Sequence, residues 1–391
     1  MNVITVSREY GAGGGEVARK LAASLGWELL DRELLSHAAA TEQMPDADLE
    51  RLDEQAIRLA DRFRRHPPHQ RYMRGLTEAV RQAVERGNVV LVGRGTRHLV
   101  GDNPDALHLR LVAPREQRVE RMARREGWSH EEALARCQLV EHTRERFLRY
   151  FFGEGAGKPE GFDLVVNTGR VHLDDVVGAV VALARGEAEG IAPGPQRKQG
   201  RVLTLSRQLG AGDTGFAPTL ADRLGMRAYD RELLEHEAQR LGVAAAELER
   251  IDEQPASFAH RFLPGDLHRR YFEALGQLMH ELAQRGDVIL VGRGGSRFLR
   301  DHPGAFHARL VSELDVRVRR VMEHRWLRQG QARELVVQTD DRRRRFYEGC
   351  FGADWSDPLE YHVTVNTGRL GPAAVDAVAA LALRCWAALA T

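Results

Sequence analysis

The chain repeats its main sequence motifs once, at a constant offset of 199 residues. Ser7-Arg8 recurs as Ser206-Arg207, and Gly93-Arg94-Gly95 recurs as Gly292-Arg293-Gly294. Three further strings recur at the same spacing: Asp31-Arg32-Glu33-Leu34-Leu35 with Asp230-Arg231-Glu232-Leu233-Leu234, Asp53-Glu54-Gln55 with Asp252-Glu253-Gln254, and Asn167-Thr168-Gly169-Arg170 with Asn366-Thr367-Gly368-Arg369. A period of this length indicates a domain duplication, because solenoid units are far shorter. The sequence therefore predicts two copies of one domain.

A Gly/Pro-rich, polar segment separates the two copies. Residues 186–200 have the composition of an exposed linker. The predicted domains are residues 1–185 and 201–391, and each is long enough to bury a core of its own. The linker also allows the two repeats to pack against each other as an internal pseudo-dimer, and a hydrodynamic radius matching two independent beads would contradict that packing.

Composition limits the partners and the compartment that are expected. The 57 basic and 56 acidic residues nearly cancel, so charge gives no argument for nucleic-acid binding. Cys137, Cys350 and Cys385 lie far apart, which predicts reduced thiols in a cytoplasmic protein and no metal-ligand set. The chain opens directly on the strand pattern Val3–Val6, so no signal peptide is expected, and no apolar stretch is long enough to predict a membrane span.

Short apolar strands alternate with helical patterns within each copy. In the first copy the predicted strands are Val3–Val6, Trp27–Leu30, Val89–Val92, Leu107–Val112 and Asp163–Val166. This alternation predicts an α/β domain with a parallel sheet that helices cover on both faces. Ligands of such sheets bind at the carboxyl ends of the strands. Because the repeated polar motifs all follow a strand, we expect them to converge on one edge of the sheet.

A glycine-rich turn follows the first strand of each copy. A turn of this kind at a helix N-terminus presents backbone N–H groups and a positive dipole end to an anion, although tight packing alone is the alternative. The residues predicted to bind phosphate are Gly11, Gly13, Gly14, Gly15, Gly210, Gly212 and Thr214. A complete phosphate loop continues with Lys and a hydroxyl residue. Those positions hold Gly14 and Gly15 in the first copy and Asp213 and Thr214 in the second, while Arg8 and Arg207 replace the first glycine of the motif.

Arginines recur after the third strand and again after the fourth. Arg94 and Arg293 lie between glycines, where a guanidinium fork matches a phosphate group. Arg118 and Arg121 match Arg317 and Arg320, and their three-residue spacing places each pair on one helical face. Such a helix can close over a transferring phosphoryl group, and a solvated basic face is the alternative.

Two further motifs keep two interpretations each. The Asp-Arg strings at Asp31 and Asp230 suit either ligand binding or an ordinary helix start, because Asp is a good N-cap. The Asn-Thr pairs, Asn167-Thr168 and Asn366-Thr367, either meet a nucleotide base or shape the turn after the last strand.

In this order, the motifs resemble the cytidylate kinase-like family of P-loop proteins, over essentially all of both copies. The resemblance implies a five-stranded parallel sheet with a helical insert and an Arg-rich lid in each copy, and a reaction that uses ATP with Mg²⁺. It also implies roles for the matched positions. The residues implied to act on the transferring phosphoryl group are Arg8, Arg118, Arg121, Arg207, Arg317 and Arg320. Those implied to bind the acceptor are Asp31, Arg32, Arg94, Asp230, Arg231 and Arg293, and those implied to meet the base are Asn167, Thr168, Asn366 and Thr367.

Each copy departs from the family pattern in a different place. The phosphate-loop Lys is absent from both, and so is the basic residue that relatives often carry one position later, where Gly15 and Thr214 stand. The second copy keeps the segment Phe351-Gly352-Ala353-Asp354-Trp355 and Tyr361, which the first lacks. Two hypotheses follow. One is a tandem phosphotransferase that uses a CMP-type acceptor, and the other is a nucleotide-binding sensor or interaction module in one or both repeats.

Overall fold

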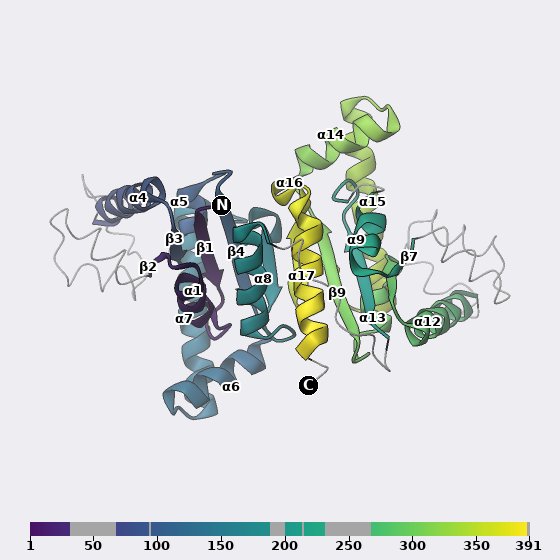
Figure 1. Cartoon of the computed structure of the whole chain (residues 1–391), viewed down its shortest axis with the longest axis horizontal. Helices are drawn as coiled ribbons and strands as arrows, with labels where there is room; N and C mark the ends of the chain where they lie inside the picture. The colour runs from purple at the N-terminus through teal and green to yellow at the C-terminus, as the bar shows by residue number, and fades with distance from the viewer. Residues whose placement is uncertain (32–67, 94, 188–199, 213–214, 231–266, 389–391) are drawn as a thin grey trace. The chain divides into compact units, whose positions relative to one another are not determined.

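The computed structural model describes residues 1–31, 68–93, 95–187, 200–212, 215–230 and 267–388 (Figure 1). The chain divides into two compact units, Met1–Glu187 and Ala188–Thr391, which hold the first and the second repeat. Most of the predicted linker lies outside the described residues, as does most of the segment between the second and third strands of each repeat.

The first repeat contains one parallel sheet. Its described strands are β1 (Val3–Arg8), β2 (Glu28–Leu30), β3 (Val89–Val92), β4 (Ala106–Val112) and β5 (Leu164–Asn167). They lie in the order β2-β3-β1-β4-β5, and every neighbouring pair is parallel. The predicted strands of this repeat are confirmed, with ends that shift by at most two residues.

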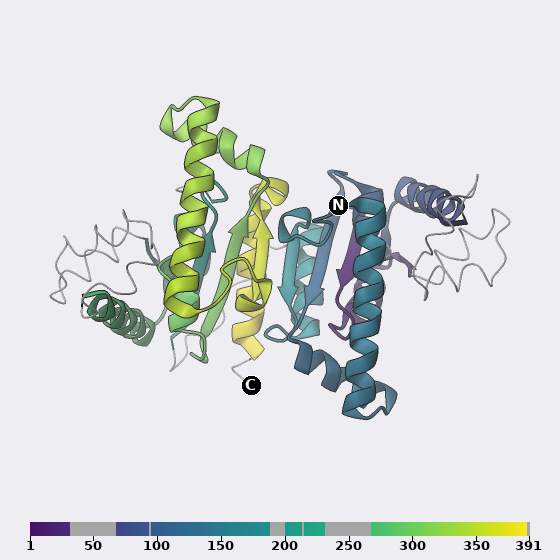
Figure 2. The same cartoon turned by 180° about the vertical axis from the view of Figure 1, so that it is seen from behind.

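Helices cover both faces of this sheet. Figure 1 shows α1 (Gly14–Leu25) and α8 (Leu173–Arg185) over one face, and Figure 2 shows α7 (His130–Phe152) over the other. The remaining described helices are α4 (Pro68–Arg86), α5 (Thr96–Val100) and α6 (Arg115–Glu126). The core under α4 joins Leu76 and Val80 to Val3, Val89 and Leu91 of the sheet.

Local sequence explains where the site-forming helices begin and end. Helix α1 starts after Gly13, whose φ of 83° is costly for residues with a Cβ, and it ends at the left-handed Gly26. Helix α7 starts with a capping box in which Ser129 and Glu132 satisfy each other's backbone N–H groups. Helices α6 and α7 therefore form a hairpin with fixed ends.

The second repeat has the same architecture. Its described strands are β6 (Val202–Arg207), β7 (Arg227–Tyr229), β8 (Val288–Val291), β9 (Ala305–Val311) and β10 (Val363–Asn366), in the parallel order β7-β8-β6-β9-β10. Its described helices are α9 (Phe216–Leu224), α12 (Leu267–Arg285), α13 (Gly295–Phe298), α14 (Leu314–Arg325), α15 (Gln329–Phe351), α16 (Thr367–Leu370) and α17 (Ala373–Ala388).

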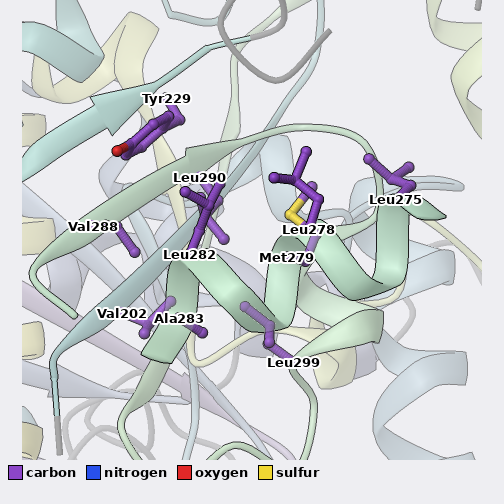
Figure 3. Packing of buried hydrophobic residues seen from close by; sticks show 10 residues of the cluster. All are labelled: Val202, Tyr229, Leu275, Leu278, Met279, Leu282, Ala283, Val288, Leu290 and Leu299. Atoms are coloured by element: carbon purple, nitrogen blue, oxygen red, sulfur yellow. The ribbon is translucent and has the colours of Figure 1, made fainter. Parts of the chain in front are cut away.

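The core of the second repeat lies between α12 and the strands β6 and β8. Figure 3 shows the buried residues Val202, Tyr229, Leu275, Leu278, Met279, Leu282, Ala283, Val288, Leu290 and Leu299 packed together. This cluster fixes α12 against the sheet in the way that the Leu76 and Val80 cluster fixes α4. Within the described residues, no helix combines the length and the apolar character needed to cross a membrane.

Candidate functional site

The repeated motifs of the first repeat gather at the carboxyl edge of its sheet. The glycine-rich loop follows β1, the Gly-Arg-Gly turn follows β3, α6 follows β4, and the Asn-Thr-Gly turn follows β5. The strand order changes direction at β1, and the carboxyl end of that strand is where open α/β sheets bind ligands. The expected convergence of the motifs is therefore confirmed.

The loop after β1 offers backbone donors at a helix N-terminus. The Ala12 N–H closes the turn by donating to the Glu9 carbonyl oxygen at 3.3 Å. In contrast, the N–H groups of residues 11 and 13–15 donate to no acceptor in the described part of the chain. Unpaired N–H groups at the positive end of a helix dipole attract anions, and phosphate groups in particular.

Close packing also explains two of the glycines in this loop. A Cβ on Gly11 would lie 2.8 Å from the carbonyl oxygen of Arg118, and a Cβ on Gly13 would lie 2.8 Å from the side chain of Leu173. A larger residue would have to displace a neighbour at either position, and the φ of 83° at both disfavours any residue with a Cβ. Tight packing and anion binding therefore do not exclude each other in this loop. The glycines allow the close packing, and the N–H groups stay available to a ligand.

Arg8 occupies the space that a phosphate-loop lysine would need. A Cβ on Gly14 would lie 2.7 Å from both Cβ and Cγ of Arg8, so the arginine stem crosses the place of any side chain at that position. The guanidinium group continues to the turn after β3, where a Cβ on Gly93 would lie 2.9 Å from Cζ of Arg8. The positive charge beside the loop thus comes from a residue at the end of β1, whereas a phosphate-loop lysine would supply it from the start of α1.

The second repeat places its equivalent arginine differently. A Cβ on Gly212 would lie 3.9 Å from Cδ of Arg207 and 2.8 Å from the side chain of Leu310. A Cβ on Gly292 would meet nothing within 4 Å, so no atom of Arg207 comes as close to this glycine as Arg8 comes to Gly93. Asp213 and Thr214 lie outside the described residues.

Arg118 is buried between the loop and the α6–α7 hairpin. Its exposed fraction is 5%, its Nε donates to Ala113 O at 2.8 Å, and its Nη1 contacts Tyr10 O at 3.1 Å and the carboxylate of Glu141. Arg317 repeats this arrangement in the second repeat through Ser312 O, Leu209 O and Asp340. These contacts hold the loop against the hairpin.

Arg121 and Thr168 connect α6 with the loop and the last strand. Arg121 donates through Nη1 to Oγ1 of Thr168 at 3.0 Å and through Nη2 to its carbonyl oxygen. The Thr168 hydroxyl donates to Ala12 O at 3.0 Å, and the residue is 3% exposed. Burial and the nearby Arg124 both lower the pKa of Arg121. Arg320 and Thr367 repeat the bonds between the guanidinium group and the threonine.

The asparagine of each Asn-Thr-Gly motif caps its own turn. Asn167 is 1% exposed, and its Oδ1 accepts the Gly169 N–H at 2.9 Å. Asn366 is equally buried, and its Oδ1 accepts the Gly368 N–H at 2.9 Å. These are the contacts expected of the turn-shaping interpretation of the motif. The base-binding role remains a prediction.

An aromatic ring packs on the Gly-Arg-Gly turn of each repeat. A Cβ on Gly95 would lie 2.7 Å from Cζ of Phe152, and one on Gly294 would lie 2.5 Å from Cε2 of Phe351. The last glycine of the turn is therefore required by a side chain of the protein itself. Arg293 is half-buried with a left-handed φ of 52°, while Arg94 lies outside the described residues.

The Asp-Arg motifs are only partly described. Asp31 is half-buried and follows β2, whereas Asp230 is exposed and follows β7. Arg32 and Arg231 lie outside the described residues, so the roles predicted for these pairs remain predictions.

Three arginines outside the predicted site residues also lie at the carboxyl edge of a sheet. Arg144 of α7 donates to Arg8 O at 3.3 Å, and Arg343 donates to Arg207 O at 2.6 Å. Arg110 lies on β4 beside Ser7 of β1. All of these positions recur at the 199-residue offset, and that recurrence is the only sequence signal that was available for them.

The described residues were compared with the needs of a metal ion. Among the described residues there is no group of three or more His, Cys, Asp or Glu side chains that would hold one. Mg²⁺ in phosphoryl-transfer enzymes is bound largely by substrate phosphates and water. Gly15, at the hydroxyl position of the first repeat, supplies no oxygen ligand from a side chain. The described residues therefore fit a Mg²⁺ ion that is carried by the phosphate groups of a nucleotide.

A parallel sheet in this strand order, with a glycine-rich loop between its central strand and a helix, defines the P-loop kinase-like class of α/β domains. The sequence profile of the cytidylate kinase-like family matches residues 3–170 and again residues 202–369. The chain belongs to this family and contains two tandem copies of its domain.

Individual relatives match one repeat or a part of it. The chain is 30% identical over 177 residues to a cytidylate kinase of Ignicoccus hospitalis, covering 45% of this chain and 95% of that enzyme. It is 29% identical over 183 residues to a cytidylate kinase of Pyrococcus horikoshii, covering 46% and 88%. A uronate isomerase of Corynebacterium glutamicum is 33% identical over 105 residues, and the chain spans only 20% of that protein.

One solved structure, that of an uncharacterized protein from Eubacterium ventriosum, is similar to part of this chain. The alignment covers 47% of this chain and 99% of the chain in that structure. Its sequence identity is 21% and its TM-score is 0.38.

Proposed function

We propose that the first repeat transfers a phosphoryl group from ATP to a nucleoside monophosphate of the CMP or dCMP type. One observation supports this proposal most. Arg8 carries a guanidinium group across Gly14, beside a loop whose N–H groups have no acceptor in the described chain. The charge that the missing lysine would supply is thus present at the same loop.

The chemistry requires little more than this arrangement. Phosphoryl transfer depends mainly on positioning the reactants and neutralising the phosphate charge. The nucleophile is an oxygen of the acceptor phosphate, so no strong base is needed. ATP brings Mg²⁺, which screens the phosphate oxygens when bound. The cytidylate kinases among the relatives support the CMP-type acceptor, and Asp31, Arg32 and Arg94 are the proposed acceptor-binding residues. Because ATP and nucleoside monophosphates are cytoplasmic metabolites, we propose the cytoplasm as the compartment.

The direct test is ADP formation from ATP by the full chain with each of the common nucleoside monophosphates. We expect turnover that is fastest with CMP or dCMP. Protein that binds ATP but produces no ADP with any acceptor would contradict the proposed function.

The second repeat supports a different proposal, nucleotide binding without catalysis. Asp213 stands at the lysine position, and its carboxylate would repel a phosphate group. Arg207 also does not come within 4 Å of a Cβ at Gly292. We expect Arg94→Ala to abolish ADP formation and Arg293→Ala to preserve it. Equal losses in both variants would assign catalysis to both repeats.

Two neighbouring glycines provide a matched test of the loop. Gly14→Ala places a methyl group 2.7 Å from the Arg8 stem, so we expect it to displace the guanidinium group and weaken ATP binding by about 10-fold or more. Gly15→Ala meets nothing within 4 Å and is expected to stabilise the protein by about 0.4–1 kcal/mol through a more restricted unfolded state. Titration calorimetry and thermal unfolding measure the two effects. Equal ATP affinities in both variants would contradict the role of Arg8.

A further inference from the structure

The fourth strand of each repeat carries an arginine beside the serine of the Ser-Arg motif. Arg110 pairs in register with Ser7, and Arg309 pairs in register with Ser206. Register partners on adjacent parallel strands lie about 5 Å apart and point to the same face of the sheet. Each repeat therefore places a hydroxyl and a guanidinium group side by side at the carboxyl edge.

A buried pair confirms which face this is. Thr5, two residues before Ser7, bonds to Nδ1 of His108 at 2.8 Å, and His108 lies two residues before Arg110. Because strand side chains alternate, Ser7 and Arg110 share the face of Thr5 and His108. This is also the face of Val3 in the core under α4, so the pair lies on the side of the sheet that α7 covers.

The second repeat closes its pair with aromatic side chains. Trp355 donates its Nε1–H to Oγ of Ser206 at 2.7 Å, and the hydroxyl of Tyr361 lies 3.4 Å from the same oxygen. Arg309 is 1% exposed, lies 4.8 Å from the centre of the Trp355 ring, and donates to Ser356 O at 3.1 Å. The serine hydroxyl and the guanidinium group are both covered.

The first repeat leaves its pair open. Ala156 and Phe162 stand at the positions of the tryptophan and the tyrosine. Arg110 lies 5.4 Å from the centre of the Phe162 ring and is only partly buried. Within the described residues, Arg110 makes no hydrogen bond or ion pair, and neither does the hydroxyl of Ser7. Burial lowers the pKa of Arg110, and the carboxylates of Glu9 and Glu145 act in the opposite direction.

A half-buried guanidinium group without a hydrogen-bond acceptor is unfavourable unless an anion binds it. The planar fork of arginine matches a phosphate group, and a serine hydroxyl adds a third donor. We propose that Ser7 and Arg110 bind the phosphate group of the acceptor nucleotide, and that Trp355 and Tyr361 close the corresponding position of the second repeat. This inference rests on the proposed function and names the repeat and the residues that take the acceptor.

The test measures monophosphate binding directly, without turnover. The full chain is titrated calorimetrically with AMP, CMP, GMP and UMP in the absence of ATP. We expect a single site per chain for the preferred nucleotide. Arg110→Met should weaken its binding by about 10- to 100-fold, the usual effect of losing charge-assisted hydrogen bonds, while Arg309→Met should leave the dissociation constant unchanged. An unchanged constant in Arg110→Met, or an equal loss in Arg309→Met, would overturn the inference.

Exchanging the closing residues tests the same inference in both directions. Ala156→Trp with Phe162→Tyr copies the closure into the first repeat and should abolish monophosphate binding, while an unchanged unfolding transition of the first repeat shows that it is folded. Trp355→Ala with Tyr361→Phe should open a second site and raise the stoichiometry from one to two. Monophosphate binding without ADP formation would refute the proposed function alone, whereas full turnover in Arg110→Met would refute this inference alone. A wild-type chain that binds no monophosphate would refute both.

Discussion

Replacing Arg8 with methionine is expected to lower kcat/KM for phosphoryl transfer by about 100- to 1000-fold, the range seen when one preorganised charge-stabilising group is removed. Methionine keeps a flexible stem over Gly14 and removes only the guanidinium group, so the loop should retain its packing. Steady-state kinetics with ATP and the preferred acceptor measure the effect. Arg8→Lys keeps the positive charge but not the planar fork of the guanidinium group. Its kcat/KM should therefore lie between those of the wild-type chain and Arg8→Met. A decrease in kcat/KM smaller than about 3-fold in Arg8→Met would show that the Arg8 guanidinium group does not stabilise the transition state.

A rescue experiment makes this prediction more specific. Arg8 stands at the first glycine of the complete phosphate-loop motif, and Gly14 stands at its lysine. Gly14→Lys alone should be inactive, because its stem would collide with Arg8. Combined with Arg8→Gly, the same change rebuilds the motif as far as the lysine and should recover activity that both single variants lose. Additive losses in the double variant would contradict the idea that the two positions exchange one charge.

The second large effect concerns stability. Arg118→Met is expected to destabilise the first repeat by about 3–5 kcal/mol, because it leaves a partly buried carboxylate and two carbonyl oxygens without their donor. The side chain of Arg118 is 7% exposed and that of its partner Glu141 is 21% exposed. Denaturant unfolding of the full chain, followed through the transition of the first repeat, measures the change.

An exposed arginine on the same helix is the control for this stability prediction. Arg125 has a side chain that is 67% exposed, and Arg125→Met should change stability by less than about 0.5 kcal/mol. An equally small change in the free energy of unfolding of Arg118→Met would show that the buried contacts of Arg118 make no net contribution to stability. A double change of Arg118 and Glu141 to apolar residues should cost less than Arg118→Met alone, since only the Glu9 carboxylate, 3.4 Å from Arg118 Nε, then loses its cation.

The sequence was sufficient to predict the duplication, the parallel sheet and the edge at which the motifs meet. Those features follow from strand spacing and the constant offset. The environment of the lid arginines did not follow. A three-residue spacing correctly places Arg118 and Arg121 on one helical face, but the pattern does not reveal what covers that face. In the structure the loop carbonyl oxygens and Thr168 cover it.

Arg110 escaped prediction for a related reason. It lies inside a strand that is otherwise apolar apart from His108, and no motif surrounds it. Its importance depends on a neighbour about a hundred residues away, Ser7, and on the absence of the tryptophan that covers Arg309. Only the register of the strands and the comparison of the two repeats bring these facts together.

The overlap between Arg8 and Gly14 also constrains how this loop can change over evolutionary time. A side chain at position 14 and an arginine at position 8 compete for one space, so each excludes the other. A lineage moving from a lysine-bearing loop must therefore lose that side chain before, or together with, gaining the arginine. The reverse route is ordered in the same way, because a lysine at position 14 fits only after the arginine at position 8 has been lost. Two positions six residues apart thus form one inherited unit, and substitutions at them are expected to occur as a pair.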